Sequence, residues 1–227
     1  MKKKQLLIVS IGILFVLGFT SCSSTKGSKQ KSTVLSGTIK NAKDGKFLFT
    51  YDTYSLLQGT TRKSIDIDEN GKFHYLLKAD GPISGTLDFG RDQIGGRGVN
   101  KYIYTYLEPG DSIHITADVD VLSDTNIIQN TLKYSGTAVL NNEFVHQADL
   151  RFESYQQLRE NNAIFIMTQQ PNQYKRTVDS IRDLKLAFVN QPRYARVSPR
   201  LKQNFEDEAN NIVFVRKFNY PSQHKSF

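Results

Sequence analysis

The chain has 227 residues, of which 38% are hydrophobic and 11% aromatic, and its formal net charge at pH 7 is +8. This length fits one domain of ordinary size with an appendage, and the 14 Phe and 11 Tyr can build a core without disulfides. The basic residues are scattered along the chain and are not clustered around aromatic platforms, which excludes a nucleic-acid-binding footprint.

The N-terminus has the organisation of a secretory signal. Three lysines at 2–4 precede an apolar run over 6–19, and two small residues then stand before Cys22. This is the order of a signal peptide. The apolar run is fourteen residues long, shorter than the roughly 20 residues that a spanning helix needs. We therefore predict that 1–21 is a signal peptide and not a transmembrane anchor.

Cys22 is the one cysteine of the sequence, so it cannot form an intramolecular disulfide. The residues before it resemble a lipobox, although Phe19 stands where a smaller aliphatic residue is usual. Each buried CH₂ of an acyl chain contributes about 0.8 kcal/mol, and two or more chains make a stable anchor. We predict lipid attachment at Cys22. The alternative is ordinary signal cleavage with an incidental cysteine.

Residues 22–33 are mostly polar and are predicted to form a lipid-anchored flexible tether. Ser23 follows the cysteine where, in the familiar lipoprotein sorting pattern, an aspartate would retain the protein at the inner membrane. The predicted location is therefore the outer membrane, facing the periplasm, with the membrane as a partner through the lipid on Cys22.

Residues 34–137 show the period-two alternation of strands, with turns at short intervals. Asn70-Gly71 predicts a tight hairpin between the third and fourth strands, and Pro109-Gly110 predicts a turn between the sixth and seventh. Together these signals predict an antiparallel β-sandwich or a barrel-like domain. The eight candidate strands are 34–40, 46–54, 61–68, 72–79, 83–90, 101–108, 112–118 and 131–137.

The apolar spacing becomes helical after Thr137. Asn141 or Asn142 is the predicted N-cap of a first helix, and Ser198 followed by Pro199 predicts the start of the last one. A mainly β domain followed by two or three amphipathic helices over 138–227 is therefore expected. The predicted apolar stripes are Phe144, Ala148, Phe152 and Tyr155, then Tyr174, Val178, Ile181, Leu184 and Phe188, then Leu201, Phe205 and Ile212.

Metal and catalytic motifs are weak. DIDENG (66–71) begins like a calcium loop, but Leu77 stands at the twelfth position, where a bidentate acid is required. The four histidines show no pair at the close spacings of metal motifs. No serine lies in a G-x-S-x-G elbow. We predict no catalytic residue, no metal ligand and no cofactor.

Two features are candidates for ligand binding. GRDQIGGRGVN (90–100) joins two strands and does not open a helix, so a long hairpin loop is expected and a phosphate cradle is not. Arg91 and Arg97 are its candidate ligand contacts. Tyr102, Tyr104 and Tyr106 share one face of a strand. Such a stripe either packs against a partner layer such as the helices, or forms a face that binds sugar or peptide.

Three further segments carry a resemblance: YIYTYLEPGDSIHITAD (102–118), YSGTAVLNNEF (134–144) and FNYPS (218–222). With the lipid-accepting cysteine, they resemble the N-terminal half of the thioredoxin-like thiol–disulfide oxidoreductase lipoproteins of Gram-negative bacteria. In that group a β domain and a helical segment precede a thioredoxin fold with a Cys-x-x-Cys active site. The likeness covers almost all of the mature chain, and its best part is the LEPGDSI turn and strand.

The sequence departs from that family at the residues that matter for activity. It has no Cys-x-x-Cys and no second cysteine, whereas the redox reaction needs one cysteine to attack and another to resolve. We also expect no βαβ domain after Phe227. No catalytic residue carries over, and we predict a non-catalytic accessory or binding module that is not an enzyme, with a thioredoxin-fold protein as a possible partner. The alternatives are a sugar- or peptide-binding outer-membrane lipoprotein and a truncated oxidoreductase without activity.

Overall fold

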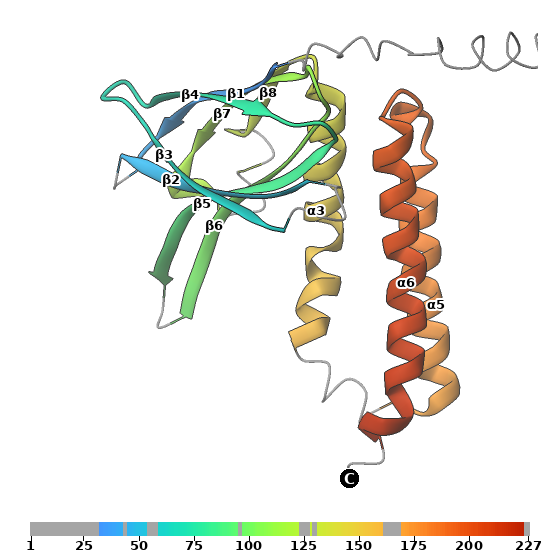
Figure 1. Cartoon of the computed structure of the whole chain (residues 1–227). Coiled ribbons are helices and arrows are strands. Elements are labelled where there is room, and N and C mark those ends of the chain that lie inside the picture. The colour runs from blue at the N-terminus through green and yellow to red at the C-terminus, as the bar shows by residue number, and fades with distance from the viewer. Residues whose placement is uncertain are drawn as a thin grey trace, which may run out of the picture. The chain divides into compact units, whose positions relative to one another are not determined.

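The computed structural model describes residues 32–42, 45–53, 59–94, 97–122, 128, 131–160 and 169–224. The predicted signal peptide and Cys22 lie outside the described residues. The strands, shown in Figure 1, are β1 (Ser32–Lys40), β2 (Lys46–Thr53), β3 (Thr61–Asp66), β4 (Lys72–Lys78), β5 (Ile83–Ile94), β6 (Arg97–Leu107), β7 (Ser112–Asp118) and β8 (Lys133–Gly136). The α-helices are α3 (Val139–Glu160), α5 (Pro171–Val189) and α6 (Pro199–His224).

The strands form two four-stranded sheets that pack together, as the sequence predicts. One sheet has the order β4-β1-β7-β8 and the other the order β3-β2-β5-β6. The second sheet is antiparallel, whereas the first is mixed because β1 and β7 run parallel. The predicted fold class, a sandwich-like β domain followed by helices, is confirmed, and the parallel pair is a feature that the alternation did not predict.

The core of the sandwich comes from the alternating residues of both sheets. Leu35 and Ile39 of β1, Phe49 of β2 and Leu87 of β5 are all buried. Aromatic rings join the two layers: Phe47 of β2 meets Phe73 of β4 edge-on, with ring centroids 4.8 Å apart. Burial of these side chains is the main force that holds the two sheets together.

The turn at Asn70-Gly71 forms where it was predicted, but it is not a hairpin within one sheet. β3 pairs with β2, whereas β4 pairs with β1 of the other sheet. Gly71 has a φ of 75°, and the Asp68 Oδ1 accepts hydrogen bonds from the amides of Asn70 (2.9 Å) and Lys72 (2.7 Å). Asp68, the third residue of the calcium-like motif, therefore fixes the turn.

Pro109-Gly110 also joins strands of different sheets, because β6 and β7 lie in opposite layers. Gly110 has a φ of 91°, and the Asp111 amide donates to the Glu108 carbonyl at 2.9 Å. The turn chemistry is as predicted, and here too the chain crosses from one layer to the other.

The predicted long loop over 90–100 is wrong in most of its length. β5 continues to Ile94 and β6 begins at Arg97, with Arg91 opposite Asn100. A register shift between Asp88 and Arg91 interrupts the ladder, close to Gly90 at a φ of 95°. The ladder continues past this bulge because backbone hydrogen bonds do not need apolar side chains. The prediction missed this extension because it used apolar alternation as the signal for strands.

The helix starts were predicted with mixed success. The last helix has the expected start, because Pro199 is its first residue and the Ser198 hydroxyl accepts from the Leu201 amide at 3.4 Å. The first helix begins at Val139, so the predicted cap at Asn141 or Asn142 is wrong. Within the described residues, no helix combines the length and apolarity needed to cross a bilayer.

Asn142 instead joins α3 to the edge of a sheet. β6 is the outer strand of its sheet, and the backbone amide and carbonyl of Tyr106 bond to Asn142 of α3. The Asn142 Oδ1 accepts from the Tyr106 amide (3.0 Å) and from the Thr105 hydroxyl (2.7 Å), and its Nδ2 donates to the carbonyls of Tyr106 (2.9 Å) and Ala138 (2.8 Å). One fully buried amide side chain thus takes the place of a neighbouring strand.

Aromatic contacts join the three helices. Phe144 of α3 meets Phe188 of α5 and Phe205 of α6, at centroid distances of 5.4 and 5.3 Å. Beyond this cluster α5 and α6 form a hairpin, shown in Figure 1. Its own small core includes Tyr174 and Tyr220, which stack at 4.6 Å.

Candidate functional site

The predicted tyrosine stripe lies on the face of β6 opposite the sandwich core. Ile103 and Leu107 point into the sandwich and are buried. Tyr106 is only 1% exposed and belongs to the aromatic cluster under the helices. Its hydroxyl donates to the Glu108 carboxylate at 3.3 Å. Tyr106 is therefore a packing residue, the first of the two interpretations considered for the stripe.

Tyr102 and Tyr104 are partly exposed, with their rings 5.1 Å apart in a T-shaped pair. The three tyrosines thus do not form one exposed patch. Arg91 and Arg97 lie on β5 and β6, but their side chains lie outside the described residues, as does Cys22. Among the candidates whose side chains the structure describes, Tyr102 and Tyr104 lie together on β6, whereas Tyr106 is buried under the helices.

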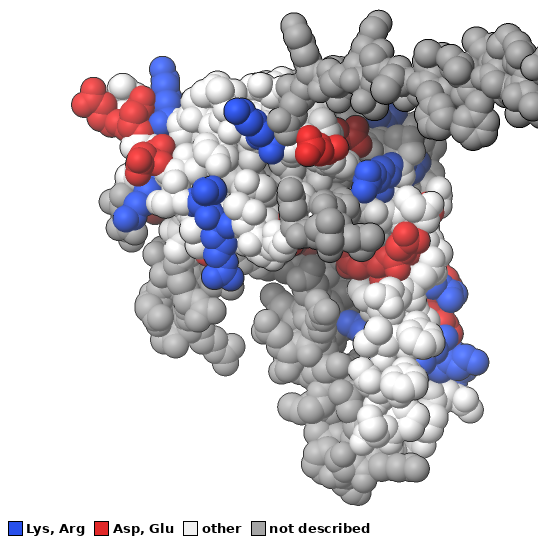
Figure 2. Space-filling view, in the orientation of Figure 1, with Lys and Arg blue, Asp and Glu red and all other residues white. Residues whose placement is uncertain are grey.

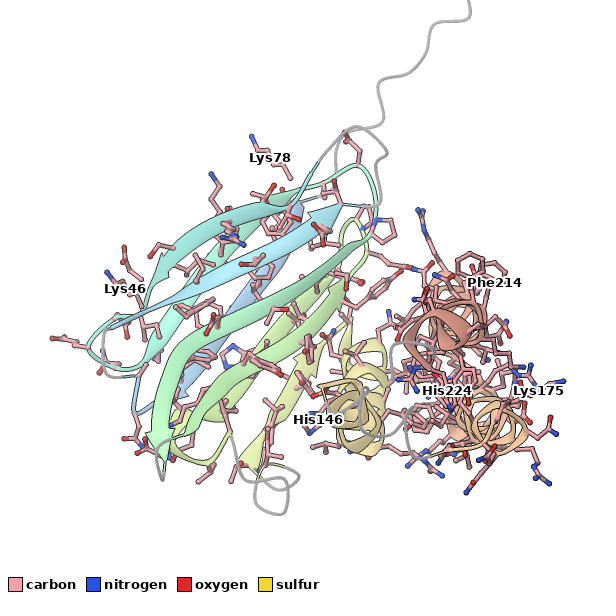
Figure 3. All side chains as sticks on the ribbon, turned by 90° about the horizontal axis from the view of Figure 1, so that it is seen from below. Lys46, Lys78, His146, Lys175, Phe214 and His224 are labelled. Carbon is pink, nitrogen blue, oxygen red and sulfur yellow. The ribbon has the colours of Figure 1, made fainter. Side chains whose placement is uncertain are left out.

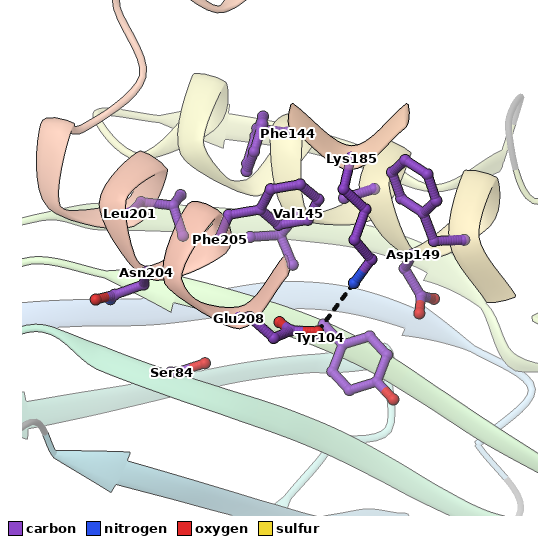
Figure 4. A pocket seen from close by; sticks show the side chains of 12 residues that line it. Ser84, Tyr104, Phe144, Val145, Asp149, Lys185, Leu201, Asn204, Phe205 and Glu208 are labelled. Carbon is purple, nitrogen blue, oxygen red and sulfur yellow. Dashed lines mark hydrogen bonds and ion pairs between the residues drawn. The ribbon is translucent and has the colours of Figure 1, made fainter. Parts of the chain in front are cut away.

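Tyr104 lines a cavity between the sheet and the helices, shown in Figure 4. Its volume is about 210 Å³. The sheet contributes one wall through β5 and β6, and the helices contribute the aromatic walls. The lining residues are Ser84, Tyr104, Phe144, Val145, Ala148, Asp149, Phe152, Lys185, Leu201, Asn204, Phe205 and Glu208.

A buried lysine is the main charged group of this cavity. Lys185 is 7% exposed, and its Nζ lies 3.0 Å from the Glu208 carboxylate (Figure 4). The same nitrogen lies 5.6 Å from the centroid of Phe152 and 5.2 Å from that of Phe205. The carboxylate and the two rings compensate the desolvation of the ammonium group.

Sequence reasoning missed Lys185 and assigned Leu184 to the apolar stripe. Leu184 is 38% exposed, whereas Lys185 is buried with Tyr174, Val178, Ile181 and Phe188. These positions follow an alternating spacing of four and three residues, and this spacing continues through 185. The signal was therefore present in the sequence, as a lysine on an otherwise apolar helical stripe.

Histidines and acids do not converge on a metal site in the described part of the chain, where no group of three or more His, Cys, Asp or Glu could hold an ion. On the face shown in Figure 2, lysines and arginines lie among aspartates and glutamates. On the helical hairpin, Lys217 of α6 forms an ion pair with Asp179 of α5. The hydrogen bond from Lys217 holds the pKa of the Asp179 carboxyl below its usual value.

Comparison of the chain with protein-family models, with curated proteins and with solved structures finds no match in any of the three.

Proposed function

We propose that the chain is a non-catalytic accessory module of the cell envelope. In this proposal, lipid on Cys22 anchors it to the outer membrane facing the periplasm, and the hairpin of α5 and α6 binds a partner protein. The observation that supports it is a pair of exposed, stacked phenylalanines on α6.

Phe214 and Phe218 are 67% and 74% exposed, and their rings stack with centroids 6.1 Å apart. They lie four residues apart, which places them one helical turn apart on the same face of α6. Val215 beside them is 45% exposed. Figure 3 shows Phe214 on the side of α6 that points away from α5. We name Phe214, Val215 and Phe218 the α6 strip.

The folding of the hairpin does not use the α6 strip. Val213 and Tyr220, on the neighbouring face of α6, are buried against Tyr174 and Val178 of α5. The Tyr220 hydroxyl also donates to the Gln169 carbonyl at 2.9 Å. Because the inner face already holds the hairpin together, the apolar residues of the α6 strip need another explanation, and a binding surface supplies one.

The size of the strip suits the centre of a modest interface. Two phenylalanines of about 200 Å² each, exposed to this degree, present on the order of 300 Å² of apolar surface. A specific interface buries about 800 Å² on each partner, of which a small aromatic centre carries most of the binding energy. Asn210 and Asn211, exposed on the same helix, can supply part of the polar rim.

The family resemblance suggests the partner. In the lipoproteins that this sequence resembles, a thioredoxin fold follows the helical segment, so the same surface in this protein would bind a thioredoxin-fold protein supplied as a separate chain. Such a complex would hold a redox protein close to the membrane, while the present chain contributes position and no sulfur chemistry.

Replacing the two phenylalanines of the α6 strip should weaken this binding without unfolding the protein. For the double substitution Phe214→Ser and Phe218→Ser, we expect at least a tenfold loss of affinity for a periplasmic thioredoxin-fold protein, because truncation of aromatic anchors typically costs about 2 kcal/mol or more each. Biolayer interferometry with the purified partner measures this loss. The melting temperature should stay within a few degrees of the wild type, since both side chains are exposed.

The matched control is Leu76→Ser, which removes a 57% exposed apolar side chain from β4, on the sandwich. It should bind the partner like the wild type. Equal affinity of the double variant and the wild type, or no binding of any thioredoxin-fold protein by the wild type, would contradict the proposed function.

The lipid anchor is tested separately with Cys22→Ser. The wild-type protein should partition into the detergent phase of a phase-separation assay, and mass spectrometry should find acyl chains on its N-terminal residue. The serine variant should move to the aqueous phase, because each lost acyl CH₂ removes about 0.8 kcal/mol of membrane affinity. A wild-type protein with a free thiol at Cys22 would refute the anchor.

A further inference from the structure

The sheet with the order β4-β1-β7-β8, here named the β1 sheet, has a basic outer face. Leu35 and Ile39 of β1 point into the core, so the residues that alternate with them point outward. The strand register continues this outer face onto β4, β7 and β8. The charged residues of the face are Lys40, Lys72, Lys78, Lys133 and Asp118. Four lysines are thus set against one aspartate.

The acids on and around this face are engaged in local structure. The Asp118 Oδ1 accepts from the Asn41 Nδ2 at 2.8 Å and from the Asp120 amide at 3.0 Å. Asp68 and Asp111, at opposite ends of the face, also accept hydrogen bonds from backbone amides. All four lysines are exposed, and within the described part of the chain none of them forms an ion pair. Their charge is therefore available to a partner.

The outer face of the other sheet has a different charge balance. Along the register of β2 with β3 and β5, its outward charged residues are Lys46, Arg62, Asp52, Asp66 and Asp88. Two basic residues stand there against three acids. Because an anionic partner is attracted by the first face and repelled by the second, it should select the β1 sheet.

The predicted anchor leads directly to the β1 sheet. Ser32, where β1 begins, follows Cys22 by ten residues, which reach at most roughly 35 Å when fully extended. In the register, Ser32 lies opposite Lys78 of β4. The sequence between Cys22 and Ser32 contains three lysines and no acid. A lipid on Cys22 would therefore bring this basic face close to the bilayer.

Leu76 gives the same end of the face an apolar contact. Its side chain is 57% exposed on β4, opposite Val34 of β1 and two residues before Lys78. Lys78 extends away from the sandwich (Figure 3). An exposed leucine beside a lysine suits the membrane interface, where the apolar side chain enters the head-group region and the ammonium group reaches the phosphates.

We propose that the outer face of the β1 sheet binds the anionic phospholipid surface of the bilayer that holds the chain. This inference rests on the lipid anchor of the proposed function. Each lysine close to an anionic leaflet adds roughly fivefold to membrane affinity. The tether also keeps the domain at a high effective concentration next to the surface, so a weak contact suffices. The contact orients the sandwich on the membrane.

Acetylation of lysines tests this orientation in the wild-type protein. The full lipidated chain is added to preformed vesicles of phosphatidylcholine, either pure or mixed in equal parts with phosphatidylglycerol, and mass spectrometry measures the labelling of each lysine. On the anionic vesicles, labelling of the four lysines of the face should fall by about threefold or more relative to the neutral vesicles. Lys46 of β2 and Lys175 of α5, both exposed, should react equally on both.

Charge removal tests the same face without the anchor. In the Cys22→Ser chain, taken from the aqueous phase, replacement of all four lysines by glutamine should lower the affinity for anionic vesicles by about tenfold or more in a co-sedimentation assay. The matched control removes four exposed charges elsewhere, and it should bind within about threefold of the unaltered face. Its substitutions are Lys46→Gln, Arg62→Gln, Lys63→Gln and Lys175→Gln. Both variants should melt within a few degrees of the wild type.

Three results would overturn the proposal. The first is equal labelling of the four lysines on neutral and anionic vesicles. The second is equal protection of Lys46 and Lys175, which would show that the domain has no preferred orientation. The third is protection by soluble dextran sulfate but not by vesicles, which would assign the face to a polyanionic polymer.

The variant with Phe214→Ser and Phe218→Ser should keep the lysine protection, because the α6 strip lies outside the β1 sheet. The Cys22→Ser chain reports on the face even where the anchor fails. Failure of this membrane contact and failure of the proposed function are therefore distinguishable.

Discussion

Replacing Asn142 with alanine is expected to lower the free energy of unfolding by about 3–5 kcal/mol. The substitution removes the three hydrogen bonds that join Asn142 to β6, together with its bond to the Ala138 carbonyl, and takes the side-chain partner from the buried amide and carbonyl of Tyr106. Each buried group without a partner costs about 1–3 kcal/mol. Urea denaturation followed by far-ultraviolet circular dichroism measures the change, and the melting temperature should fall by roughly 10 °C.

Two further variants test the cause of this loss. Asn142→Asp keeps an acceptor for the Tyr106 amide but cannot donate to the carbonyls, and it also buries a charge, so it should be destabilised by a similar amount. Asn210→Ala replaces an exposed asparagine of α6 and should be neutral within about 0.5 kcal/mol. A change below about 1 kcal/mol in Asn142→Ala would show that water replaces the side chain at this edge.

Replacing Phe144 with alanine is the second large perturbation that we expect, with a loss of about 3–5 kcal/mol. Phe144 is 1% exposed and contacts Phe188, Tyr194 and Phe205 from three different elements. Its removal leaves a cavity where α3 meets α5 and α6. Because Phe144 does not belong to the sandwich core, we expect the helices to lose more stability than the strands.

Hydrogen exchange measured by mass spectrometry checks this distribution. Peptides from α5 and α6 should exchange faster in Phe144→Ala, while peptides from β1 and β7 keep most of their protection. Phe214→Ala is the matched control, since it truncates the same residue type at an exposed position of α6 and should change the free energy of unfolding by less than about 0.5 kcal/mol. Uniform loss of protection in all strands would show instead that the sandwich and helices unfold as one unit.

The candidate sites show why a site is harder to derive than a fold. Tyr102, Tyr104 and Tyr106 attracted attention because they alternate along one strand, yet Tyr106 packs in the core and the three form no common patch. The lysines of the β1 sheet drew no such attention because they are distant in sequence, and only the pairing of β1 with β4 and β7, and of β7 with β8, brings them to one face. Lys185 was also missed, although its position on the apolar stripe of α5 can be derived from the residue spacing.

The sequence by itself determined the local elements of this protein. Alternation of apolar and polar residues predicted six of the eight strands to within two residues at each end, and it missed the last four residues of β5 and the first four of β6. Ser198-Pro199 predicted the start of α6. Side-chain periodicity and turn chemistry depend on neighbours within a few residues, so they can be read from the chain directly.

Only the tertiary structure decided which elements pair. The turns at Asn70-Gly71 and Pro109-Gly110 were correctly located, but each leads to the opposite sheet. Asparagine is a residue type that often caps helices, but Asn142 instead bonds to the edge strand β6 as a neighbouring strand would. A turn has the same local conformation whether its two flanking strands pair with one another or with other strands. Which strands pair therefore depends on burial of the whole core and not on any local signal.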